Sequence, residues 1–178
     1  MYLLLGLDSK AAMRSQLSPV HCLVGDIETL PLPGKFDLII SASTFQWFAC
    51  PEKTYTRLSE HLFPGGWMVF STFGENNFRE LKILTGSGLT YQSLKEITVL
   101  LERDLEVLHA EEELYTLEFE DPLEVLQHVK KTGVNATSVS RQWTRGRLID
   151  FSQEYKARFL VDGQCPLTYH PLYLICRK

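Results

Sequence analysis

Hydrophobic and polar positions in residues 1–120 alternate between strand-like and helix-like segments, the pattern of a parallel sheet covered by helices. Short, mainly apolar runs predict strands at residues 2–7, 20–24, 36–41 and 67–73. Pro51 fits the first position of a helix, and a second helical pattern covers residues 94–101. The run 36–41 is almost continuously apolar, so we expect that strand to be buried on both faces.

The last third of the chain has a different pattern. Residues 105–119 alternate as one or two strands would, and Asp121 with Pro122 is typical of a helix start. Residues 134–146 are rich in Ser, Thr and Arg and predict a loop. An amphipathic helix should follow, with an apolar face made of Leu148, Phe151, Tyr155 and Phe159. The chain should close with one strand over residues 167–176.

Length and composition favour a single globular domain, because 178 residues with 44% apolar and 22% charged residues are ordinary for one. No apolar run approaches the ~20 residues that cross a bilayer. The first residues lack the positive charge of a signal peptide, so we expect a cytoplasmic protein. The cysteines have no metal-binding or redox spacing, and we expect them to be reduced and mostly buried.

Charge is distributed unevenly along the chain. Residues 1–120 carry 9 Lys and Arg against 17 Asp and Glu, whereas residues 121–178 carry 9 against 5. The net charges are therefore -8 and +4, which add to the -4 of the whole chain. This asymmetry predicts an anionic partner at the C-terminal third, but the basic patch is too weak to indicate nucleic acid.

Two acidic residues follow predicted parallel strands, Asp8 after the first and Asp26 after the second. In open α/β sheets, ligands bind just beyond the carboxyl ends of the strands. A carboxylate at that edge can accept hydrogen bonds from both hydroxyls of a ribose. Asp26 could instead accept from an adenine amino group, with Ile27 covering the ring. Both acids could equally be helix caps or loop residues.

Several segments resemble the motifs of class I S-adenosylmethionine-dependent methyltransferases. Residues 6–9 (GLDS) are similar to that fold's second-strand motif, and residues 25–28 (GDIE) to its third-strand adenine motif. Residues 36–41 resemble the fourth strand, and residues 63–66 (FPGG) the turn into the fifth. The resemblance implies an α/β Rossmann-like sheet with helices on both faces and S-adenosylmethionine as cofactor. The implied cofactor contacts are Asp8, Asp26, Ile27, Ser41 and Ala42.

Four further segments narrow the resemblance to the malonyl-acyl-carrier-protein O-methyltransferases of biotin synthesis. They are residues 41–47 (SASTFQW), 129–136 (VKKTGVNA), 144–148 (TRGRL) and 166–170 (PLTYH). The resemblance covers essentially the whole chain. It implies one methyltransferase domain over residues 1–178, with a helical substrate cap at 121–162. It also implies methyl transfer to the free carboxylate of a malonyl thioester carried on acyl-carrier protein.

The family begins with a helix, a first strand and a GxGxG turn that have no counterpart after Met1. We therefore expect an N-terminally truncated methyltransferase that lacks the first strand and its glycine-rich turn. In the family's sheet this strand lies in the middle, so its absence would leave two edges unpaired.

The resemblance also suggests residues on the substrate side. Arginine pairs with both oxygens of a carboxylate, so Arg141, Arg145 and Arg147, in the predicted loop, could hold the malonyl group. The other candidates for substrate contact are Gln46, Trp47, Tyr169 and His170. The candidate docking residues for the acidic carrier protein are Lys130, Lys131, Lys156 and Arg158. Each of these could instead be a solvated surface residue or a packed core residue.

No catalytic base is expected, because a carboxylate of pKa ~4 is already ionised at neutral pH. No metal is expected, because His21, His61, His109 and His128 do not have the spacing of metal ligands. Two other functions stay open from the residues alone. A nicotinamide-dependent oxidoreductase also places an acid after its second strand, although this chain has no GxGxxG motif. An inactive or partner-binding methyltransferase remnant is the non-enzymatic alternative.

Overall fold

The computed structural model describes residues 23–132 and 143–178. Asp8, Arg141, the predicted strand at 2–7 and residues 20–22 of the predicted strand at 20–24 lie outside this part of the chain. Contacts divide the chain into two compact units. Unit 1 comprises the described part of Met1–Thr72 with Gln92–Glu112 and Leu172–Lys178, and unit 2 comprises Phe73–Tyr91 and Glu113–Pro171. The described residues of the predicted cap segment 121–162 lie within unit 2, and the single domain stays a prediction.

The described residues form strands and helices that alternate in the first half of the chain. The strands are β1 (Phe36–Ala42), β2 (Leu62–Phe73), β3 (Glu106–Glu112), β4 (Tyr115–Phe119), β5 (Cys165–Tyr169) and β6 (Pro171–Arg177). The helices are α1 (Pro51–Glu60), α2 (Arg79–Thr85), α3 (Leu94–Leu101), α4 (Pro122–Lys131), α5 (Arg145–Phe159) and the short 3₁₀ helix η1 (Phe45–Trp47). The strand at 36–41 and the helices beginning at Pro51 and Leu94 confirm the sequence predictions.

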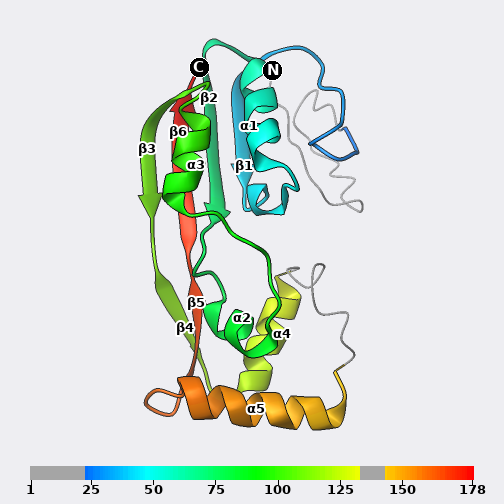
Figure 1. The fold of residues 1–178 in the computed structure, drawn as a ribbon, viewed down its shortest axis with the longest axis vertical. Coiled ribbons are helices and arrows are strands. Elements are labelled where there is room, and N and C mark those ends of the chain that lie inside the picture. Colours follow the sequence, from blue (N-terminus) through cyan, green and yellow to red (C-terminus); the bar gives the residue numbers. More distant parts are fainter. Residues whose placement is uncertain (1–22, 133–142) are drawn as a thin grey trace, which may run out of the picture. The chain divides into compact units, whose positions relative to one another are not determined.

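Unit 1 is built on a four-stranded sheet in the order β1-β2-β6-β3 (Figure 1). β1 and β2 run parallel with Ile39 opposite Met68, and β6 runs antiparallel to β3. One face of the sheet carries the core, in which Met68, Leu172 and Leu174 are at most 1% exposed. These residues belong to one hydrophobic cluster with the buried residues of α1 and α3.

The opposite face of this sheet presents apolar side chains to solvent. Ile40 is 58% exposed, and Trp67 and Tyr173 are each 40% exposed. The expectation that β1 is buried on both faces is therefore wrong for the described residues. Among them, β1 pairs only with β2 and stands at the edge of the sheet, and of its side chains only Phe36 and Ile39 are buried.

Unit 2 contains the two-stranded antiparallel sheet β4-β5 with α2, α4 and α5. Asp121 begins α4 by accepting a hydrogen bond from the Leu123 N–H, as its position before Pro122 predicts. The core of the unit includes Tyr155 and Leu167, both 0% exposed. Its apolar face on α5 contains Phe151 and Tyr155, which confirms the predicted amphipathic helix.

The last predicted strand is wrong in one respect, because residues 167–176 are divided between two sheets. β5 pairs with β4 and β6 pairs with β3, and His170 lies between them. The backbone C=O and N–H groups of His170 form hydrogen bonds with the loop that follows β2 and not with a neighbouring strand. Its carbonyl accepts from Gly74 N–H at 2.8 Å, and its N–H donates to Asn77 Oδ1 at 3.2 Å.

Two other elements differ from the sequence predictions. α2 was not predicted, and α5 begins at Arg145 instead of after a loop that ends at residue 146. The Thr144 hydroxyl accepts from Arg147 N–H and so caps α5 one residue before it starts. Arg145 and Arg147 therefore lie in the first turn of a helix.

Cys165 and Cys176 are buried free thiols, whereas Cys50 is exposed, so burial is confirmed for two of the three described cysteines. Burial raises the pKa of Cys176 to about 11. No helix within residues 23–132 or 143–178 combines the length and apolar character needed to cross a membrane. The same residues form no group of His, Cys, Asp and Glu side chains that could hold a metal ion.

Candidate functional site

The predicted adenine motif forms a hydrogen-bonded turn in unit 1. The Asp26 carbonyl accepts from the N–H groups of Thr29 and Leu30, and its carboxylate Oδ1 accepts from Glu28 N–H at 2.9 Å. Asp26 is exposed, whereas Ile27 is 6% exposed and packs in the unit 1 core. The turn therefore presents one carboxylate to solvent and anchors itself through the next side chain.

Two side chains fasten this turn to α1. The Glu28 carboxylate accepts hydrogen bonds from the N–H groups of Ala49 and Cys50, each at 2.9 Å, and from the Thr54 hydroxyl at 3.0 Å. The Arg57 guanidinium donates to two carbonyls of the turn, those of Ile27 and Leu30. Glu28 thus satisfies N–H groups at the start of α1, and Arg57 holds the turn from within the helix.

The hydrogen bonds of Glu28 make the stability of unit 1 depend on pH. Burial raises the pKa of this carboxyl, but the hydrogen bonds from Ala49, Cys50 and Thr54 outweigh it, and the net pKa lies below 4.5. Because folding lowers the pKa of this carboxyl, its ionised form stabilises the fold at pH values above the pKa of the unfolded chain. This stabilisation is lost as the pH falls through the pKa of the folded chain. Glu28→Gln should therefore destabilise unit 1 by about 2 kcal/mol at pH 7, and the difference should shrink below about pH 4.5.

Urea unfolding of both proteins between pH 7 and pH 3 measures this difference. Glu60→Gln is the matched control, because Glu60 is an exposed carboxylate at the other end of α1. A constant difference across this range would contradict the assigned role of Glu28.

The segment after β1 carries the other predicted cofactor contacts. Ser41 and Ala42 end the strand, and Ser43 adopts a left-handed conformation with φ of 50°. The Ser43 N–H donates to the Ser71 carbonyl at 3.0 Å, so the bend is fixed to β2. Gln46 Nε2 donates to the Ser43 carbonyl at 2.6 Å.

The side chains of Gln46 and Trp47 both lie in η1 and are half-buried. The Gln46 amide is engaged at both ends, because its Oε1 also accepts from the Thr72 hydroxyl at 3.3 Å. In this structure it therefore stabilises the bend after β1. Its predicted contact with a thioester, and that of Trp47, stay predictions.

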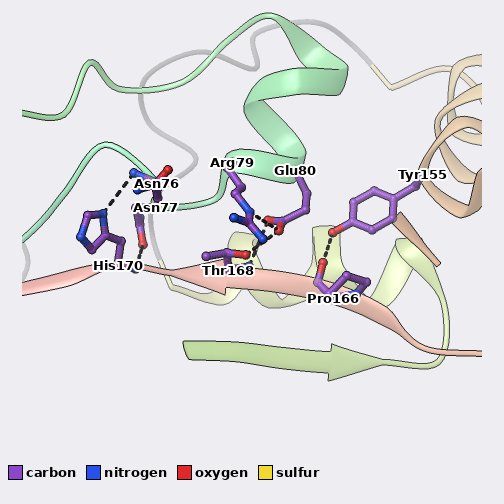
Figure 2. Close-up of polar contacts among 8 residues, drawn as sticks. All are labelled: Asn76, Asn77, Arg79, Glu80, Tyr155, Pro166, Thr168 and His170. Atoms are coloured by element: carbon purple, nitrogen blue, oxygen red, sulfur yellow. Dashed lines mark hydrogen bonds and ion pairs between the residues drawn. The ribbon is translucent and has the colours of Figure 1, made fainter. Parts of the chain in front are cut away.

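A polar network in unit 2 surrounds the junction between β5 and β6 (Figure 2). His170 is 3% exposed, and its Nδ1 accepts from Asn76 N–H at 3.2 Å. Asn77 is 1% exposed and donates through Nδ2 to the Tyr91 hydroxyl at 3.2 Å. A Cβ at Gly74 would lie 2.6 Å from the His170 ring, so only glycine permits this approach.

Glu80 fastens α2 to β5 in the same unit (Figure 2). It is 2% exposed, and its carboxylate accepts from both the N–H and the hydroxyl of Thr168, at 3.0 and 2.5 Å. Arg79 supplies a positive charge at 3.1 Å. This carboxylate is fully engaged by structural contacts, so it holds the helix in place.

Tyr169 ends β5 and does not begin the last strand as predicted. Its ring stacks on Tyr115, and its hydroxyl is 2.7 Å from His128 Nε2. Burial, with smaller contributions from Tyr115 and Tyr91, raises its pKa to about 12. The hydroxyl therefore stays protonated at neutral pH and can donate to His128.

Unit 2 also contains a cavity of about 500 Å³. It is enclosed by α2, the segment 87–91, α4 and the residues at the start of α5. Most of its wall is apolar, and its polar groups include Asn77, Tyr91, Gln127, Lys82 and Lys130. Neither Tyr169 nor His170 lines it. Of the predicted substrate-side residues, only the docking candidate Lys130 does.

The described basic residues among the predicted site residues fall into three groups. Lys156 pairs with Asp121 at 3.0 Å, and Arg158 pairs with Glu154 at 2.5 Å on the same helix. Lys130 and Lys131 are exposed in the last turn of α4, and neither forms an ion pair with a described residue. Arg145 and Arg147 are exposed at the start of α5, close in sequence to Leu148 of the cavity wall.

Sequence reasoning missed the residues that hold these sites together. Glu28 and Arg57 were not predicted as site residues. The signal that could have indicated them is an acid directly after Asp26-Ile27 together with an arginine on the facing helix. The cavity wall was also missed. Its residues are scattered from Asn77 to Leu148, and no local motif connects them.

Comparison with known proteins agrees with the fold. Residues 4–70 match the sequence model of a methyltransferase domain family. A methyltransferase-type protein of Bacillus halodurans has a similar crystal structure, with a TM-score of 0.63 at 16% sequence identity. The alignment covers 89% of this chain and 78% of that one. The fold is thus that of the class I methyltransferases.

Two curated relatives are closer in sequence. The malonyl-[acyl-carrier protein] O-methyltransferase of Bacteroides thetaiotaomicron is 42% identical, over 89% of this chain and 64% of the relative. The enzyme of the same name from Bacteroides helcogenes is 44% identical, over 89% of this chain and 58% of the relative. The chain therefore spans roughly three-fifths of the length of these relatives.

Proposed function

We propose that this chain, a relative of the malonyl-[acyl-carrier protein] O-methyltransferases with a class I methyltransferase fold, takes part in the reaction named for them. The reaction would be S-adenosylmethionine-dependent methylation of the free carboxylate of a malonyl thioester on acyl-carrier protein, an early step of biotin synthesis. The observation that carries this proposal is the 42% identity to a curated enzyme of that name over 89% of the chain.

The geometry of the turn at Asp26 supports binding of the adenosine part of the methyl donor. Asp26 Oδ1 is engaged by the Glu28 N–H, whereas Oδ2 accepts no hydrogen bond from the described residues. The exposed carboxylate thus has an oxygen left for an amino or hydroxyl group. Glu28 and Arg57 fix the turn, so the carboxylate is held before any ligand arrives. Ser41 and Ala42 remain candidate contacts at the end of β1.

The chemistry asks little of the protein beyond positioning. S-adenosylmethionine supplies a methyl group on a positively charged sulfur. The malonyl carboxylate is ionised at neutral pH, so no residue needs to remove a proton. One carbon–oxygen bond forms as one carbon–sulfur bond breaks, and the two opposite charges disappear together. The residues of the site must therefore hold a carboxylate oxygen ~3 Å from the methyl carbon, in line with the carbon–sulfur bond, and exclude water.

The substrate side of the proposal rests on the basic residues of unit 2. Arg145 and Arg147 are exposed in the first turn of α5 and have the fork geometry that grips a carboxylate. Lys130 and Lys131 are the better docking candidates for an acidic carrier. Lys156 and Arg158 already neutralise carboxylates of this chain.

Calorimetric titration with S-adenosylhomocysteine tests the proposal directly. We expect binding with a dissociation constant of about 1 μM, weakened roughly tenfold or more by Asp26→Asn, because charge-assisted hydrogen bonds contribute about 1.5–3 kcal/mol. Asp37→Asn is the matched control, an exposed aspartate in β1 that should leave affinity unchanged. A folded chain that binds no S-adenosylhomocysteine would overturn the proposal and favour a non-catalytic remnant.

A further inference from the structure

We propose that the cavity of unit 2 receives the pantetheine arm of an acyl-carrier protein docked at the C-terminal end of α4. This inference rests on the proposed function, because it assigns where that function's thioester substrate enters. The cavity encloses about 500 Å³, within the range of about 300–1,000 Å³ typical of small-ligand sites.

The cavity wall suits a slender chain of methylene, methyl and amide groups. Aliphatic and aromatic side chains make up most of the wall, among them Phe78, Leu81, Leu126 and Trp143. Such a surface gains free energy by covering the apolar parts of the arm.

A few polar groups provide partners for the amides of the arm. Asn77 is 1% exposed and uses its Oδ1 for His170 N–H and its Nδ2 for the Tyr91 hydroxyl oxygen. The Tyr91 hydroxyl oxygen is the acceptor in this contact, so its own proton can be donated to another acceptor. Burial raises the pKa of Tyr91, although the hydrogen bond from Asn77 opposes this, so the hydroxyl remains a donor at neutral pH. An amide carbonyl is the acceptor that this donor fits.

Cationic side chains border the cavity on two sides. Lys82 from α2 and Lys130 from α4 line it and are exposed, and neither pairs with a carboxylate of the described residues. Lys131 is exposed beside Lys130 but does not line the cavity. These charges lie where the phosphate of the arm and the acidic surface of its carrier would approach. Free pantetheine, which has neither a phosphate nor a carrier, would use the cavity but not Lys131.

The test compares binding of a bacterial acyl-carrier protein with the arm (holo) and without it (apo). We expect the wild-type chain to bind the holo form about tenfold more tightly, which corresponds to about 1.4 kcal/mol. Gln127→Trp places a large ring in the cavity from an exposed position on α4, and the holo preference should fall to about one. Gln153→Trp, the same change at an exposed position of α5 outside the cavity wall, should keep it.

Two further measurements separate the possible outcomes. Lys131→Glu should weaken holo-carrier binding several-fold and leave the binding of free, uncharged pantetheine unchanged, and equal effects on both would overturn carrier docking at α4. The cavity assignment is wrong if wild type shows no holo preference or if Gln127→Trp retains it. S-adenosylhomocysteine titration of the same samples keeps the two proposals apart. Binding of S-adenosylhomocysteine without a holo preference would refute only the cavity assignment. A holo preference without binding of S-adenosylhomocysteine would refute only the proposed reaction.

Discussion

Glu80→Ala is expected to destabilise unit 2 by about 4 kcal/mol. The substitution leaves the buried N–H and hydroxyl of Thr168 without their shared acceptor and removes the partner of Arg79. Hydrogen exchange measured by mass spectrometry reports this locally, since peptides covering α2 and β5 should exchange about a thousandfold faster.

Glu75→Ala is the control for this prediction, because Glu75 is an exposed acid in the same unit and should change exchange little. Glu80→Gln should give an intermediate loss, since the amide keeps one acceptor oxygen and places an NH₂ group against a donor. Equal protection in wild type and Glu80→Ala would show that Thr168 finds other partners and that Glu80 does not hold α2.

Phe36→Ala is expected to destabilise unit 1 by about 4 kcal/mol, the usual cost of removing a fully buried aromatic ring. Phe36 is 1% exposed at the start of β1, where it pairs with Leu62 and joins the core cluster. Urea unfolding followed by exchange protection of peptides from α1 and β2 measures the loss in this unit alone.

Phe63→Ala is the matched control, because this phenylalanine lies in β2 but is 45% exposed. It should cost well under 1 kcal/mol. If the two substitutions destabilised unit 1 equally, the core would not be organised around the strand face that carries Phe36.

The elements that sequence predicted correctly carry local signals. α1 begins with Pro51 at its first position, and α3 begins with a capping box between Ser93 and Glu96. α4 begins at Asp121 and Pro122 in the same way. In each case the apolar spacing agrees with a start signal, which is Pro51 alone for α1 and a capping side chain for α3 and α4, so the helix could be recognised without its surroundings.

The helix that was missed, α2, has no such signal. It follows Phe78 in a left-handed conformation with φ of 54°, has no capping side chain, and buries only Glu80. The helix α5 was predicted, but its start was placed too late because Thr144 and Gly146 suggest a loop, although the Thr144 hydroxyl caps the helix. The division of the last strand at His170 depends on Gly74 and Asn77, which lie far away in sequence. These features follow from contacts between distant segments, which single-sequence patterns do not contain.

The candidate site divides in the same way. The GDIE segment and its resemblance to a methyltransferase motif drew attention to Asp26 and Ile27. Only the folded chain revealed that Glu28 and Arg57 fix this turn, because Glu28 accepts from residues at the start of α1 and Arg57 donates from α1 to carbonyls of the turn. The folded chain also decided which cationic residues form ion pairs, because Lys156 pairs with Asp121 and Arg158 pairs with Glu154.

By itself, the sequence determined the α/β character, the existence of a strand at 36–41, three helix starts and the similarity to a methyltransferase family. These are properties of short segments, since hydrophobic periodicity and capping act within a few residues. The tertiary structure decided the division into two units, the buried contacts of Glu80, and the cavity between α2 and α4. Burial and hydrogen bonding join residues that are distant in the chain, so these features exist only after the chain has folded.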